Sequence, residues 1–87
     1  MIDDILLPGE FVGIKEAAPI FRIDERTLRR WYEDEPRIGR RSLARGRIEI
    51  SLPATLMYRV GRSDAIDLYC QGLRNHKAVI PFIEAFK

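Results

Sequence analysis

The chain has 87 residues, of which 32% are charged, and its net charge is +2. This length predicts one small domain with a modest core. Cys70 is the only cysteine, which excludes an internal disulfide and a cysteine-cluster metal site. No apolar run approaches the roughly 18 residues of a membrane span. Asp3 and Asp4 stand where a signal peptide carries positive charge, so we expect a cytoplasmic protein with no membrane partner.

The N-terminal part predicts an arm, a short strand and a first helix. Residues 1–9 form the expected arm, and residues 10–12 suit a strand. From residue 14 on, apolar side chains recur with the spacing of a buried helical face, at Ile14, Ala17, Ala18 and Phe21. Pro19 lies beyond the first turn, so we expect this helix to be short or bent.

A second helix is predicted from Asp24 to about residue 35. The Asp24 carboxylate can cap its N-terminus, and Pro36 disfavours helix in the residue before it. Its inward stripe consists of Ile23, Leu28, Trp31 and Tyr32, whereas Arg26, Arg29, Arg30 and Glu33 fall on the other side. Two short helices separated by a few residues predict a helix-turn-helix, whose second helix reads DNA. The alternative is an ordinary amphipathic helix with a solvated basic face.

An arginine-rich β-hairpin is predicted directly after Pro36. Residues 47–51 alternate polar and apolar, which places Ile48 and Ile50 inward, with Ile38 pairing from the first strand. Such a hairpin is called a wing, and its candidate DNA-contacting residues are Arg37, Arg40, Arg41, Arg45 and Arg47. The alternative is a solvated hairpin whose arginines protect an edge strand from aggregation. We therefore predict a mainly α fold with a small β-hairpin wing, a winged helix-turn-helix DNA-binding domain over residues 10–62.

The positive charge is concentrated in the centre of the chain. Residues 22–62 hold eleven arginines against six acidic residues, a balance of +5, and no lysine. Arginine forms two-pronged hydrogen bonds with phosphates and guanine edges that lysine cannot form. This distribution indicates a localised anionic partner, and double-stranded DNA fits it.

Residues 63–87 predict a C-terminal helix and an apolar tail. A helix beginning at Leu52-Pro53 precedes them and ends at Gly61, and Ser63 or Asp64 can cap the next one. The apolar residues of the tail are Val79, Ile80, Phe82, Ile83 and Phe86. Termini fray unless they dock. The tail therefore docks either on its own domain or in a groove of the next copy, where it would serve oligomerisation.

These stretches resemble a known family. Residues 13–18 (Gly-Ile-Lys-Glu-Ala-Ala), residues 23–31 (Ile-Asp-Glu-Arg-Thr-Leu-Arg-Arg-Trp), Pro36 and the basic hairpin look like the MerR-like winged helix-turn-helix. They are most similar to its small stand-alone members, the excisionases or recombination directionality factors of phages and integrative elements. The resemblance covers residues 10 to about 60. Asp24 departs from the usual Ser, and Pro19 is unusual in the first helix.

The resemblance implies roles for individual residues. Arg26 and Thr27 would lie near phosphates or base edges, and Arg29 or Arg30 would reach into the major groove. The hairpin arginines Arg40, Arg41, Arg45 and Arg47 would follow the backbone or enter the minor groove. Leu28 and Trp31 match core positions of the family.

The resemblance also implies a function. We expect a bacterial or phage protein, associated with the nucleoid, that binds DNA selectively and cooperatively with copies of itself and assists an integrase in excising a mobile element. Three alternatives stay open: a small MerR-like transcription regulator, a DNA-recognition domain related to phage small terminase, and a protein-interaction module for an acidic partner. The sequence has no paired carboxylates in a credible setting, no nucleophile with a base and no Gly-rich phosphate loop. We therefore expect no enzymatic activity, no cofactor and no metal.

Overall fold

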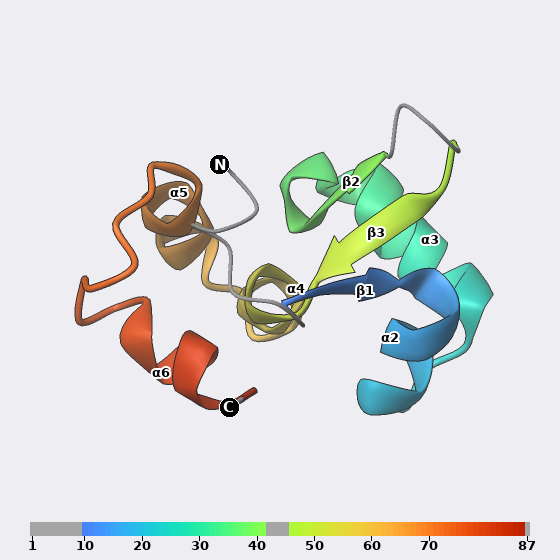
Figure 1. The fold of residues 1–87 in the computed structure, drawn as a ribbon, viewed down its shortest axis with the longest axis horizontal. Helices are drawn as coiled ribbons and strands as arrows, with labels where there is room; N and C mark the ends of the chain where they lie inside the picture. The colour runs from blue at the N-terminus through green and yellow to red at the C-terminus, as the bar shows by residue number, and fades with distance from the viewer. Residues whose placement is uncertain (1–9, 42–45, 87) are drawn as a thin grey trace.

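The computed structural model describes residues 10–41 and 46–86, which form helices around a small antiparallel sheet (Figure 1). The predicted class, mainly helical with a β-hairpin, is confirmed at this level. The predicted N-terminal arm of residues 1–9 lies outside the described residues, and so does Arg45. No described helix has both the length and the apolar character needed to cross a membrane.

Three strands make the sheet, with the last of them in the middle. The strands are β1 (Phe11–Gly13), β2 (Gly39–Arg41) and β3 (Ile48–Ser51), in the spatial order β1-β3-β2. Arg41 lies opposite Ile48 and Gly39 opposite Ile50. A Cβ on Gly39 would come within 2.6 Å of the carbonyl oxygen of Glu49. A glycine is therefore needed where β2 approaches β3.

Helices α2 (Ile14–Ile20) and α3 (Glu25–Asp34) follow the predicted pattern. Ile14, Ala17, Ala18 and Phe21 are buried, and α2 is short, as Pro19 predicts. The Asp24 side chain accepts a hydrogen bond from the backbone N–H of Thr27 at 2.7 Å, so it caps α3 as expected. Between the helices, Arg22 has a φ of 57°, a left-handed conformation uncommon for a residue with a side chain.

The segment after α3 differs from the predicted strand. Residues Pro36–Ile38 form a short 3₁₀ helix, η1, and Ile38 is buried in the core. The Glu35 side chain accepts a hydrogen bond from the backbone N–H of Arg37, which caps the turn. Pro36, with its fixed φ, suits the first position of such a turn better than a paired strand. The strand begins only at Gly39.

Three further helices complete the fold: α4 (Leu52–Arg59), α5 (Ser63–Cys70) and α6 (Ile80–Glu84). Helix α4 begins at Leu52-Pro53 as predicted, and Gly61 follows its end with a φ of 75°. The predicted cap of α5 is wrong, because Arg62 holds the N-cap position and Ser63 and Asp64 lie inside the first turn. Asp64 instead accepts hydrogen bonds from the Arg62 guanidinium.

Two clusters of buried side chains form the core. The first joins α2, α3 and β3, and the second joins η1, α4, α5 and α6. Trp31 and Tyr32 of α3 are half-buried and pack against both clusters, and the Trp31 ring lies 5.5 Å from that of Tyr58. The position of α3 therefore depends on both halves of the chain.

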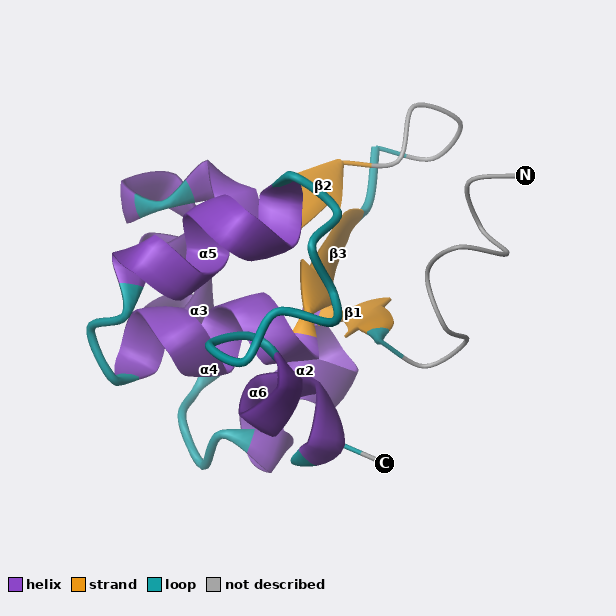
Figure 2. Ribbon diagram, turned by 90° about the vertical axis from the view of Figure 1, so that its left-hand side faces the viewer, coloured by secondary structure: helices purple, strands orange, loops and turns teal. Residues whose placement is uncertain are grey.

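The apolar tail packs on its own domain. Val79 and Ile83 are buried in the second cluster, and α6 lies beside α4 (Figure 2). The Phe86 ring stands edge-on to that of Phe21, with 6.0 Å between the ring centroids. Of the predicted oligomerisation residues, Val79 and Ile83 are thus inaccessible to another copy, and Ile80 is the most exposed. A small domain has few apolar side chains for its core, and this one uses its tail.

This packing predicts different effects for two isoleucines of α6. Ile83→Ala should lower the free energy of unfolding by about 2–4 kcal/mol, because it leaves a cavity in the core. Ile80→Ala should cost less than about 1 kcal/mol, since Ile80 is 39% exposed and Ile83 only 7%. Urea unfolding of both variants measures the difference. Equal, small losses would contradict the packing of α6 on its own domain.

Candidate nucleic-acid interface

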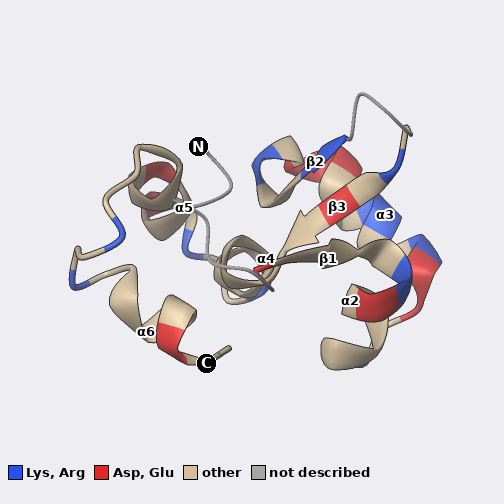
Figure 3. Cartoon of the chain, viewed as in Figure 1, with Lys and Arg blue, Asp and Glu red and all other residues tan. Residues whose placement is uncertain are grey.

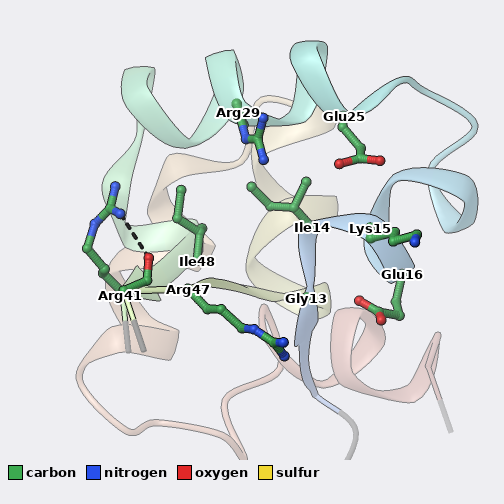
Figure 4. Close-up of a pocket in the computed structure, with 10 residues that line it drawn as sticks. Gly13, Ile14, Lys15, Glu16, Glu25, Arg29, Arg41, Arg47 and Ile48 are labelled. Carbon is green, nitrogen blue, oxygen red and sulfur yellow. Dashed lines mark hydrogen bonds between the residues drawn. The ribbon is translucent and has the colours of Figure 1, made fainter. Parts of the chain in front are cut away.

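A cleft of about 720 Å³ separates α3 from the β2–β3 hairpin and the start of α2 (Figure 4). Four basic and two acidic side chains line it: Lys15, Arg29, Arg41, Arg47, Glu16 and Glu25. Of the predicted site residues, the structure thus brings Arg29 of α3 together with Arg41 and Arg47 of the hairpin. Lys15, Glu16 and Glu25 were not predicted as part of the site.

Helix α3 holds its arginines outward for a local reason. Leu28 is fully buried, so Arg26 and Arg30, on the opposite side of the helix, and Arg29, on its flank, are exposed. Hydrogen bonding from Thr27, by its side chain and its backbone amide, lowers the pKa of Asp24. The carboxylate thus stays ionised and keeps the first turn of α3 capped. Thr27 thus serves the cap of α3 with its backbone amide, and its side chain is half-buried.

Some arginines of the centre are held by partners within the fold. Arg37 lies in η1, not in the hairpin, and its guanidinium pairs with Glu35, with 3.0 Å between Nε and Oε1, and with Asp67 of α5. The hydrogen bonds that Arg37 donates to these carboxylates raise its pKa. The assignment of Arg37 to the wing is therefore corrected. It joins η1 to α5, and nothing in the sequence marks Asp67 as its partner.

Arg40 and Arg59 are also engaged. Arg40 pairs with Glu49 across the hairpin, with 2.9 Å between Nε and Oε1, and lies over the Phe11 ring at 4.1 Å. Arg59 donates to the backbone carbonyl of Phe21 at 2.7 Å. Arg40 remains half-buried on the sheet, so a DNA contact would compete with its two existing interactions.

Unlike Arg37, Arg40 and Arg59, the arginines of α3 and of the hairpin tip have few or no partners within the described residues. Within the described residues, no ion pair or hydrogen bond occupies the guanidiniums of Arg26, Arg29, Arg30 and Arg47, and all four are exposed. Arg41 is exposed too, and donates one hydrogen bond to the carbonyl of Gly46 at 3.1 Å. Figure 3 shows positive residues on α3 and near the tips of β2 and β3. Of the four unoccupied guanidiniums, those of Arg29 and Arg47 belong to residues that line the cleft, whereas Arg26 and Arg30 lie elsewhere on α3.

A buried polar network lies away from the cleft. The Glu10 carboxylate accepts hydrogen bonds from the Tyr69 hydroxyl at 2.7 Å and from the Arg74 guanidinium, and Ser51 lies 3.0 Å from the same hydroxyl. Burial, above all, raises the pKa of Tyr69 to about 12. The network ties the residue before β1 to α5 and to the segment that follows it. Its members are up to 64 residues apart, so sequence spacing gives no signal for it.

The described residues include no group of three or more His, Cys, Asp and Glu side chains arranged to hold a metal ion. Cys70, on the exposed side of α5, has a pKa raised mainly by partial desolvation.

No family model, no curated protein and no solved structure matches this chain.

Proposed function

We propose that this chain binds double-stranded DNA as a winged helix-turn-helix, with α3 in the major groove and the β2–β3 hairpin as the wing. The observation that carries the proposal is which arginines have partners within the fold and which do not. Arg37, Arg40 and Arg59 have partners within the protein. Arg26, Arg29, Arg30 and Arg47, by contrast, are exposed, and no ion pair or hydrogen bond within the described residues occupies their guanidiniums.

This difference between paired and unpaired arginines favours an anionic ligand at the cleft for an energetic reason. A guanidinium in an ion pair must give up its partner before it binds a phosphate, while an unpaired one gives up only water. Phosphate contacts by such residues release counterions from DNA and supply much of the binding free energy. An α-helix fits the major groove, where side chains reach the base edges.

The excisionase role rests on the resemblance of residues 10 to about 60. In this role, several copies load side by side on DNA, and the assembly helps an integrase to excise an element. One small recognition helix contacts little DNA, so contacts between neighbouring copies would add selectivity. Because the buried side of α6 is used within the chain, such contacts need another surface.

Titration of the full chain on duplex DNA from its own genetic neighbourhood, at several salt concentrations, tests the proposal. We expect the logarithm of the association constant to fall linearly with the logarithm of the salt concentration. The slope should be about −3 to −5, as four or five phosphate contacts predict. Failure to bind any duplex at physiological salt would overturn it and favour an acidic protein partner.

The form of the complex separates the DNA-binding alternatives. Cooperative loading as a ladder of complexes supports the excisionase role. A two-fold symmetric footprint over a promoter supports a transcription regulator, and a closed ring without DNA supports a relative of the small terminase.

A further inference from the structure

The cleft beside α3 is not uniformly positive. Glu25, the first residue of α3, lines it together with Arg29, which lies one helical turn further on (Figure 4). Figure 4 shows both side chains leaving α3 toward β1 and the hairpin. Residues four apart share a helix face, with about 5–6 Å between their Cβ atoms. A ligand that Arg29 contacts in the cleft therefore also meets the Glu25 carboxylate.

Glu25 has acceptor capacity that the fold does not use. It is exposed, and no ion pair or hydrogen bond joins its side chain to another part of the described chain, Arg29 included. Its place in the first turn suits the helix dipole, which explains why the helix tolerates it. That interaction does not occupy the carboxylate oxygens.

A carboxylate in this position favours hydrogen-bond donors on DNA and repels hydrogen-bond acceptors. Phosphate oxygens and base acceptors, such as O4 of thymine or O6 of guanine, repel a carboxylate and offer it no proton. The exocyclic N4 amine of cytosine donates a hydrogen bond in the major groove and fits an acidic side chain. Phosphates instead suit Arg41 and Arg47, at the hairpin side of the same cleft.

We propose that Glu25 is a specificity-determining residue that selects cytosine through its N4 amine, while Arg29 donates to O6 and N7 of a guanine. The inference rests on the proposed DNA-binding function. Because adjacent helical turns are about 5.4 Å apart and base pairs about 3.4 Å apart, the two bases lie within about two base pairs of each other. Glu25 acts by attraction to the cytosine amine and by repulsion of O6 and N7 of guanine and O4 of thymine. Adenine also offers an amine, N6, but its neighbouring N7 acceptor repels the carboxylate.

Selection of binding sites from a randomised duplex pool tests the proposal with the full chain and its variants. The wild-type protein should prefer cytosine at one position by about tenfold or more. In Glu25→Gln, the same position should lose that preference and favour adenine, because a glutamine amide pairs with N6 and N7 of adenine. Glu25→Ala should lose the cytosine preference without gaining one for adenine.

Glu33→Gln is the matched control, because Glu33 is exposed near the other end of α3 and does not line the cleft. It removes the same charge and should leave the cytosine position unchanged. An unaltered cytosine preference in Glu25→Gln, or a wild-type site without one, would overturn the assignment of Glu25 while leaving DNA binding intact. If the wild-type protein binds no duplex, both the assignment and the proposed function fail.

Discussion

Glu10→Ala is expected to lower the free energy of unfolding by about 3 kcal/mol, the lower end of the range for breaking a buried ion pair. The Glu10 side chain is 6% exposed and that of Arg74 19%, so removing the carboxylate leaves a largely buried guanidinium unpaired. The Tyr69 hydroxyl also loses the acceptor of its hydrogen bond. Some relaxation of Arg74 toward solvent keeps the loss from being larger. Urea unfolding followed by circular dichroism measures it.

Two further variants test whether this loss of stability comes from the buried Glu10–Arg74–Tyr69 network. Glu33→Ala removes an exposed glutamate and should change stability by less than about 0.5 kcal/mol. The double variant Glu10→Ala/Arg74→Ala should lose less than the two single variants combined, with a coupling of about 0.5–3 kcal/mol. A loss in Glu10→Ala no larger than that in Glu33→Ala would show that Glu10 and Arg74 are not paired in the folded protein.

The parts of this fold that could be predicted from sequence are those with local causes. The cap by Asp24, the stop before Pro36 and the burial of Leu28 each depend on residues a few positions apart. The spacing of Ile14, Ala17 and Ala18 likewise predicts the buried face of α2. These signals are enough for the two helices and for the outward direction of the α3 arginines.

The remaining parts depend on contacts between distant residues. In the sequence, nothing distinguishes Arg37 from the other arginines of the basic stretch, because its pairing with Asp67 requires α5 to pack against η1. The tail residues Val79 and Ile83 have the composition of either a core or an interface, and only the packing of α6 decides between them. Lys15 and Glu25 join the cleft because α2 and α3 meet the hairpin there.

Because Arg41 and Arg47 of the hairpin have no carboxylate partner within the described residues, their removal is expected to weaken DNA binding. The double variant Arg41→Ala/Arg47→Ala should weaken binding to every duplex, on the order of tenfold for each arginine at about 0.1 M salt. The slope of log affinity against log salt should become shallower by about two, because each arginine is expected to contact one phosphate. Fluorescence anisotropy with one specific and one scrambled duplex, over a salt series, measures both quantities.

A charge-matched control separates contact from general electrostatic attraction. Arg37→Ala/Arg62→Ala removes the same two positive charges, but from guanidiniums paired with Glu35, Asp67 and Asp64. Any long-range effect of net charge acts in both double variants, while direct phosphate contacts are lost only from the hairpin. The control should therefore keep its salt slope and bind DNA within about threefold of the wild type, an allowance for that long-range effect. Equal weakening in the two double variants would mean that the hairpin arginines act only through the overall field, and the β2–β3 hairpin would then not be a DNA-contacting wing.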